Sequence, residues 1–196
     1  MAKARPITGL DTHAPTGKNA RIIAKVRLEE LYSWEQYVDN PYYVRELHNL
    51  RIATKRLRYT LEVFEEVLSE ACGPIIKELE QIQEELGNLH DSDVMIALLR
   101  LCLGSQDSGA IYEQALAHAN GTKKKAKGAK LLLPPELVRD LVDLAAVPHV
   151  EERYGLEQLL YQQQQRREDL YTVFRQHWYQ LQARDFRREI VAALEA

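Results

Sequence analysis

The sequence predicts an all-α protein built as an antiparallel bundle of about five to seven helices. Apolar residues recur at helical spacing along nearly the whole chain of 196 residues, and no segment shows the strict alternation that marks a strand. The breaks between the periodic segments are short, which favours helices that pack against their neighbours in the sequence. The segments do not repeat at a fixed period, so a solenoid is not expected.

The breaks divide the chain into seven expected helices. Pro41, in DNPYY, suits the first turn of the second helix. Gly73 suits the end of that helix and Pro74 the start of the third. A linker rich in Gly and Lys occupies residues 120–134. The expected helices are residues 19–38, 42–70, 75–103, 108–119, 135–146, 151–182 and 184–195.

The composition is that of an ordinary globular protein, with 45% hydrophobic and 28% charged residues. No run of about 20 apolar residues occurs, so no membrane span is expected. Residues 1–18 lack the apolar core of a secretory signal and are expected to form a flexible arm before a helical domain at 19–196. Cys72 and Cys102 have no metal-ligand spacing, which favours reduced thiols in a cytoplasmic protein.

The charges are unevenly distributed along the chain. The net charge is −3, yet residues 43–60 contain five basic residues and one acidic residue, and residues 61–93 contain one basic and ten acidic residues. A general nucleic-acid-binding domain is usually basic overall. A local basic segment in an acidic chain favours a confined anion.

Four basic side chains share one face of the second expected helix. At about 100° per residue, they fall opposite the apolar stripe that meets the core. Such a row is unfavourable unless an anion or carboxylates lie against it, and the Arg fork matches phosphate. A solvated charged face is the alternative, but such a face usually mixes both signs. We call these residues the basic row: His48, Arg51, Lys55 and Arg58. Arg56 projects from a different edge.

The third expected helix carries charges in its apolar stripe. His90 and Asp93 fall within the stripe, while Asp91 points away from it. A buried carboxylate needs a partner or a proton, and the basic residues of the second helix are the expected partners. A metal site formed by the three residues is disfavoured because Asp91 diverges and no further ligand cluster is visible.

The long helix near the C-terminus has a similar feature. Arg167 lies in a stripe with Tyr171 and other aromatic residues, either as a snorkelling side chain or as a cation facing an enclosed anion. Arg175 flanks it on another edge. Arg21 and Lys25 share a face of the first helix and could extend the basic patch.

Two segments resemble the CHAD family, a name that stands for conserved histidine α-helical domain. LHNLRIATKRLRYTLEVF is followed about 30 residues later by LGNLHDSDVMIALL. The first segment matches the family at His48, Arg51, Lys55, Arg56 and Arg58, and the second at Leu86, Gly87, Asp91 and Asp93. The resemblance implies an all-helical domain that binds inorganic polyphosphate through a basic pore or groove.

This sequence departs from the family pattern in two places. Relatives are often built from two similar four-helix units around the pore, whereas here the basic motif occurs once, which predicts half a pore or a homodimer that completes it. His90 stands where many relatives have Arg. The E-x-E-x-K motif of a fused triphosphatase domain is absent, so no catalysis is inherited from such a partner.

The sequence therefore predicts a non-catalytic polyphosphate-binding protein of the cytoplasm, free or on polyphosphate granules, with no cofactor and no metal. The alternatives are a metal-assisted phosphohydrolase that uses His90, Asp91 and Asp93, and an interaction module for an acidic partner protein. Nucleic acid is not favoured, because no exposed aromatic platform is expected beside the cations. The expected binding residues are His48, Arg51, Lys55, Arg56, Arg58, Arg21, Lys25, Arg167 and Arg175, supported by His90, Asp91, Asp93 and Tyr171.

Overall fold

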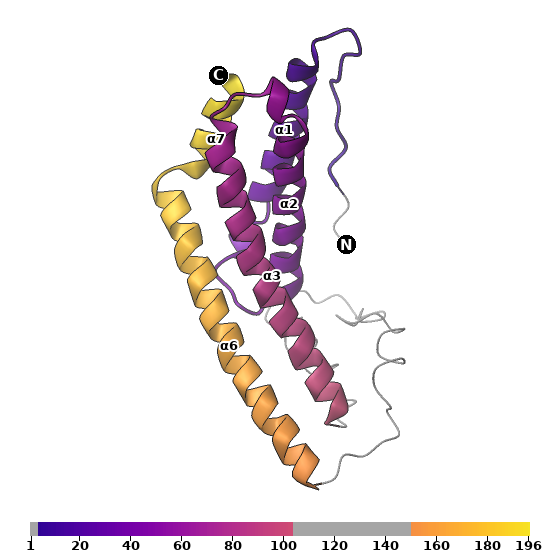
Figure 1. Cartoon of the computed structure of the whole chain (residues 1–196), viewed down its shortest axis with the longest axis vertical. Coiled ribbons are helices and arrows are strands. Elements are labelled where there is room, and N and C mark those ends of the chain that lie inside the picture. Colours follow the sequence, from indigo (N-terminus) through magenta and orange to yellow (C-terminus); the bar gives the residue numbers. More distant parts are fainter. Residues whose placement is uncertain (1–3, 104–149) are drawn as a thin grey trace. The chain divides into compact units, whose positions relative to one another are not determined.

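The computed structural model describes residues 4–103 and 150–196 and is all-helical there, which confirms the predicted fold class. Five α-helices and two short 3-10 helices occupy these ranges (Figure 1). They are α1 (Thr16–Tyr32), η1 (Glu35–Tyr37), α2 (Val44–Val63), η2 (Glu65–Val67), α3 (Cys72–Cys102), α6 (Val150–Ala183) and α7 (Phe186–Glu195). The helices expected at 108–119 and 135–146, and the linker at 120–134, lie outside the described residues.

Several helix ends differ from the prediction. α1 begins directly after Pro15 and includes part of the expected arm. The second helix is shorter than expected: α2 ends at Val63, and the backbone is extended at Leu68. The prediction that Gly73 ends this helix is wrong, because Gly73 and Pro74 both lie in the first turn of α3. Proline is tolerated there since the first-turn N–H groups have no partner within the helix.

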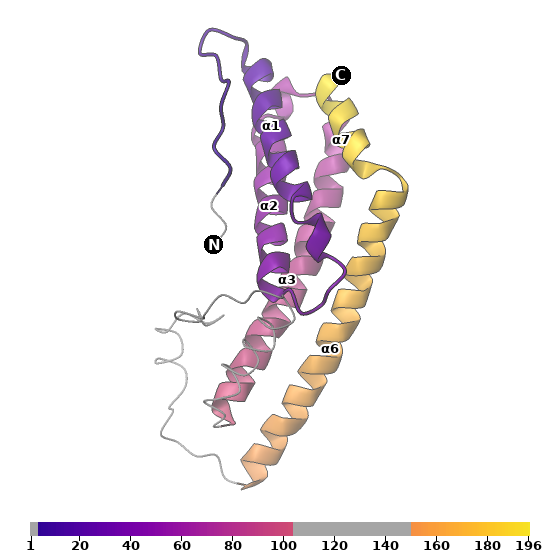
Figure 2. The same cartoon turned by 180° about the vertical axis from the view of Figure 1, so that it is seen from behind.

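The described residues belong to two compact units. Of the described residues, the first unit contains 4–40, 44–87 and 172–196, and the second contains 41–43, 88–103 and 150–171. In the first unit, α1 and α2 lie side by side and run in opposite directions (Figures 1 and 2). The core of this unit is mostly leucine, as the apolar spacing predicts. Its largest fully buried side chains are Leu28, Leu31, Leu50, Leu57, Leu61, Leu79, Ile82, Leu86, Phe174 and Ile190.

No helix in the described ranges is long and apolar enough to cross a membrane.

The segment before α1 makes specific contacts with that helix. The backbone N–H of Asp11 donates to Asn19 Oδ1 at 3.1 Å, and Asn19 Nδ2 donates to the Asp11 carbonyl at 2.7 Å. Nearer the N-terminus, Arg27 donates to the carbonyl of Arg5 at 3.1 Å. The segment therefore has fixed neighbours at two places, and the flexibility of the arm stays a prediction.

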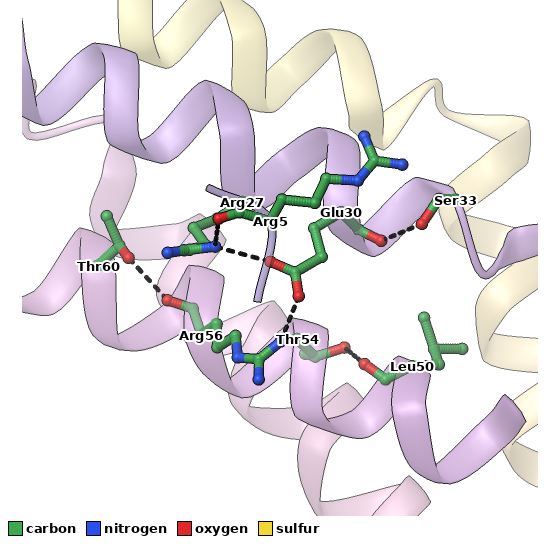
Figure 3. Close-up of polar contacts among 8 residues, drawn as sticks. All are labelled: Arg5, Arg27, Glu30, Ser33, Leu50, Thr54, Arg56 and Thr60. Atoms are coloured by element: carbon green, nitrogen blue, oxygen red, sulfur yellow. Dashed lines mark hydrogen bonds and ion pairs between the residues drawn. The ribbon is translucent and has the colours of Figure 1, made fainter. Parts of the chain in front are cut away.

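A buried carboxylate joins α1 to α2 (Figure 3). Glu30 is only 3% exposed, and it accepts hydrogen bonds from Arg27 at 2.8 Å and from Arg56 of α2. Since a buried carboxylate is stable only when it is paired, two guanidinium groups on one carboxylate satisfy it well. The hydroxyl of Thr54 donates to the Leu50 carbonyl one turn earlier, so this buried polar side chain is also satisfied.

Replacement of Glu30 should destabilise the first unit strongly. Glu30→Ala leaves Arg27 and Arg56 without their shared carboxylate, and loss of one partner of a buried pair typically lowers the free energy of unfolding by about 3 kcal/mol. Glu29→Ala is the matched control, because the neighbouring Glu29 is exposed and pairs with the exposed Arg187. An exposed pair contributes less than about 1 kcal/mol. Urea unfolding followed by circular dichroism measures the free energy of unfolding of both variants. Equal losses of stability would contradict a structural role for the ion pairs of Glu30 with Arg27 and Arg56.

Candidate functional site

The basic row lies on a face of α2 that adjoins the buried stripe. The prediction that it lies opposite the stripe is wrong for Arg51 and Arg58, because both side chains reach α3. Leu50, Leu57 and Leu61 of that stripe are fully buried, as the helical wheel predicts. Lys55 of the row is exposed, whereas His48, Arg51 and Arg58 are partly buried. A plain solvated face would expose all four cations. The partial burial of three of them therefore favours a built site over a simple charged surface.

Arg51 of the basic row lies against α3 of the same unit. A Cβ added to Gly87 would lie 3.5 Å from Arg51 Nε and 3.8 Å from its Nη2. The Nε atom is buried and has no hydrogen-bond partner within the described ranges. Nor does any carboxylate there pair with the Arg51 guanidinium. The Arg51 charge therefore has no compensating carboxylate in the described ranges, and an anion that reached its other N–H groups would accept charge-assisted hydrogen bonds.

Arg58, at the C-terminal end of the row, is already balanced by carboxylates. Its Nε lies 3.2 Å from Glu62 Oε1, one turn along α2, and its Nη1 lies 3.4 Å from Glu80 Oε1 on α3. Glu62 is one of the acidic residues that follow the row, and the i, i+4 spacing brings it back to Arg58. The charge of Arg58 is thus already compensated by two carboxylates in the absence of a ligand.

Lys55 has no carboxylate partner within the described part of the chain. Its ammonium lies 5.4 Å from the centre of the Tyr59 ring, and the Arg58 guanidinium lies 4.8 Å from the same ring. Tyr59 is 42% exposed. The expectation that no exposed aromatic residue stands beside the cations is therefore wrong at this position, because Tyr59 projects from an edge of α2 next to the row.

The other expected binding residues of the first unit lie in separate contacts. Arg56 pairs with Glu30, on the different edge that the wheel predicts. Arg21 donates from Nε to the Leu194 carbonyl at 2.7 Å, and Lys25 pairs with Glu195 at 2.9 Å. These two cations meet the C-terminal end of α7, where carbonyls lack helical partners and the helix dipole is negative.

Arg175 lies on α6 beside the segment that follows η1. Its guanidinium contacts Asp39 at 3.1 Å and donates to the Tyr179 hydroxyl at 3.0 Å. The Tyr179 hydroxyl also donates to Asp39, and this bond is the main reason that the pKa of Asp39 is lowered. Among the described residues, Arg175 shares no hydrogen bond or ion pair with the basic row.

In the second unit, Arg167 is buried and pairs with Asp93. The two side chains are 6% and 4% exposed. Arg167 Nε donates to Asp93 Oδ1, and its Nη2 donates to the Pro41 carbonyl at 2.6 Å. The anion that faces Arg167 is therefore a protein carboxylate. Burial raises the pKa of Asp93, and the charge and hydrogen bond of Arg167 only partly oppose this effect.

The partner expected for Asp93 was on the second helix, and this prediction is wrong, because the partner Arg167 is on α6. A helical wheel gives the face of each helix but does not identify the neighbouring helix. Asp91 is exposed, as predicted, and Tyr171 of the same unit is buried. Within the described ranges, no group of three or more His, Cys, Asp or Glu side chains is arranged to hold a metal ion. His90, Asp91 and Asp93 therefore do not form such a group.

Sequence reasoning missed a cluster that joins α3 and α6 in the first unit. The His177 ring lies between two carboxylates, with Nδ1 2.8 Å from Glu85 Oε2 and Nε2 3.0 Å from Glu78 Oε1. Burial alone would raise the pKa of Glu78, but hydrogen bonds from Arg184 and His177 hold it below its usual value. Glu78 and Glu85 are two turns apart on one helix face, yet nothing in the sequence indicates that His177 lies opposite them.

Comparison with protein families supports the two-motif resemblance. Residues 10–100 match the model of the CHAD domain, so the predicted recognition is confirmed over this part of the chain. The match spans α1 and α2 and nearly all of α3, and it therefore includes the whole basic row. Neither the curated proteins nor the solved structures gave a match.

The two aspartates of α3 should differ sharply in their effect on stability. Asp93→Ala leaves the Arg167 charge buried without its carboxylate, and the free energy of unfolding should fall by about 3 kcal/mol. Asp91→Ala, two residues earlier and exposed, should change it by less than about 0.5 kcal/mol. Urea unfolding of both variants tests this. A small effect of Asp93→Ala together with a large effect of Asp91→Ala would reverse the assignment of their roles.

Proposed function

We propose that this chain, which carries a CHAD domain over residues 10–100, binds inorganic polyphosphate through the basic row of α2 and does not hydrolyse it. CHAD domains are known as polyphosphate-binding modules, and the matched part of this chain contains the row. The observation that supports the proposal is that Arg51 and Lys55 lack ion-pair partners among the described residues. These two cations lie on the same helix face, and neither has a carboxylate partner in the described part of the chain.

The chemistry of the row suits a polyanion. From Arg51 to Arg58 the cations extend over roughly 10 Å of helix, at 1.5 Å per residue. A flexible phosphate chain can place one oxyanion against the Arg51 fork and another against the Lys55 ammonium. Arg58 can join these contacts by exchanging its carboxylate partners for phosphate oxygens. Each contact is a charge-assisted hydrogen bond, and their sum should weaken steeply as salt rises.

The positions of Asp91 and Asp93 favour binding of polyphosphate over its hydrolysis. The phosphohydrolase alternative needs Asp93 as a metal ligand, but Asp93 is already the counterion of the buried Arg167. Asp91 is exposed and diverges from it. We propose that Asp93, as the counterion of Arg167, supports the fold of the second unit instead, and that the protein acts in the cytoplasm, free or on polyphosphate granules.

The presence of a single basic motif also has a consequence for the number of chains in the complex. The described row presents cations from one side only, and a polyanion held on one side keeps oxygens available to a second set of cations. We propose that a second copy of the chain supplies this set, so that two half-sites enclose the polyphosphate.

Removal of the two unpaired cations should weaken binding strongly. The double variant Arg51→Gln, Lys55→Gln should bind labelled polyphosphate about 100-fold more weakly, because each charge-assisted contact contributes about 1.5 kcal/mol and about 1.4 kcal/mol corresponds to a tenfold change. The matched control is Lys77→Gln, Arg188→Gln, which removes the same charge from exposed positions outside the row. Fluorescence polarisation at constant salt measures both, with circular dichroism to verify helicity. Equal affinities of the two double variants would exclude the row as the site.

Polyphosphate should change the mass of the protein in solution. Light scattering coupled to size exclusion should give the mass of two chains per complex when polyphosphate is in moderate excess, and this mass should return to that of one chain for Arg51→Gln, Lys55→Gln. RNA with the same number of phosphates serves as the competitor. If RNA displaced polyphosphate at equal concentration, the row would accept phosphate groups of either polyanion, and selectivity for inorganic polyphosphate would be excluded.

A further inference from the structure

Gly87 lies in the interior of α3, where a glycine is unfavourable. It costs about 1 kcal/mol relative to alanine in such a position, because it loses more conformational freedom on folding. Its backbone is helical, so a side chain would meet no conformational strain there. The space beside Gly87 therefore determines which side chains this position could accept.

The space beside Gly87 is occupied by Arg51. A Cβ at Gly87 would lie 3.5 Å from Arg51 Nε and 3.8 Å from Nη2, which is ordinary van der Waals contact. An alanine methyl group would therefore just fit. Any side chain with γ-carbons would have to share the volume that the guanidinium occupies, since helix sterics leave few alternative χ1 rotamers.

Comparison with the other described glycines shows that Gly87 is distinctive. At Gly73 and Gly155 an added Cβ would meet nothing within 4 Å. At Gly17 it would meet the backbone carbonyl of Val67 at 3.0 Å and Arg21 Nη1 at 3.6 Å, so that glycine permits a close backbone approach near a cation outside the basic row. Of the glycines in the described ranges, Gly87 is the one whose Cβ position faces a guanidinium of the basic row.

The contact also fixes which atoms of Arg51 remain available. The Nε atom is buried and has no hydrogen-bond partner in the described ranges, and Nη2 also lies near the Cβ position of Gly87. The Nε–Nη2 edge of the guanidinium thus lies along α3 at this glycine. A planar guanidinium placed by one edge has its other N–H groups fixed in direction, which suits contacts to phosphate oxygens.

We infer that Gly87 is a positioning residue of the polyphosphate site: its missing side chain provides the surface on which the Arg51 guanidinium lies. This inference rests on the proposed function and adds a specific determinant to it. Gly87 itself makes no contact with the ligand in this arrangement. It acts through Arg51, by leaving room for the Nε–Nη2 edge of the guanidinium against α3.

Three substitutions at Gly87 separate positioning from general stability. Gly87→Val should bind polyphosphate about tenfold more weakly, because a β-branched side chain has the least rotamer freedom to avoid the guanidinium. Gly87→Ala should bind within about twofold of the parent, since its methyl group fits and the helix is favoured. Gly87→Met, unbranched and a good helix former, provides a second displacing variant if Gly87→Val does not fold. Equal affinities of the three variants would overturn the inference.

The double variant Arg51→Gln, Gly87→Val gives the decisive comparison. If Gly87 acts only through Arg51, then Gly87→Val should cause no further loss of affinity once Arg51 is replaced. A full tenfold loss in the Arg51→Gln background would show that Gly87 acts by another route. The slope of log affinity against log salt should also decrease by the same amount in Gly87→Val as in Arg51→Gln, because both lose the same phosphate contact.

A readout without ligand distinguishes failure of this inference from failure of the proposed function. The Nε–Hε resonance of Arg51, assigned by its loss in Arg51→Lys, reports the placement of the guanidinium. It should shift strongly in Gly87→Val and only slightly in Gly87→Ala. If the parent protein did not bind polyphosphate but the resonance shifted as expected in the two variants, the proposed function would be wrong and the placement of the Arg51 guanidinium beside Gly87 would be correct. An unshifted resonance in Gly87→Val would overturn the placement whatever the binding result.

Discussion

Burial of the leucine stripe of α2 is the constraint on which the candidate site depends. Leu50, Leu57 and Leu61 are completely removed from water, each contributing about 1.5–3 kcal/mol, and together they fix the rotation of the helix about its axis. A shift by one residue would turn the helix by about 100° and bury cations. With the stripe inside, the basic row lies beside it, where Arg51 and Arg58 reach α3 and Lys55 is exposed. The hydrophobic core thus determines which face of α2 presents Arg51 and Lys55.

The carboxylates of the fold then determine which cations are available to a ligand. Glu30 holds Arg56 together with Arg27, Asp93 holds Arg167, and Glu62 and Glu80 lie against Arg58. Buried cations have to be paired in this way, because an uncompensated charge in the interior is strongly unfavourable. Arg51 and Lys55 have no such partner in the described residues. A chain that is acidic overall can therefore still present a local basic site, since its acidic residues neutralise specific neighbours and leave two cations one turn apart on α2 without a carboxylate partner in the described residues.

The sequence identified the charged residues that lie in apolar stripes, but it did not identify the residues with which they pair. Arg167 and Asp93 were each recognised as a charge in an apolar stripe, because a helical period is visible within one segment. Their pairing was not predicted, since it depends on which two helices meet. The same holds for Arg21 and Lys25, which share a face as expected but meet the C-terminal end of α7. Gly87 was recognised only as part of a motif, and its contact with Arg51 required the distance between α2 and α3.

By itself, the sequence determined the helical class, the apolar stripe of α2, the row of cations along another face of that helix and the family resemblance. These properties follow from local spacing along one helix, which the order of residues specifies directly. The tertiary structure alone decided which cations are neutralised, that Asp93 belongs to Arg167, and that Arg51 lies over Gly87. These outcomes depend on distances between residues far apart in the chain, and only the packing of the helices brings such residues together.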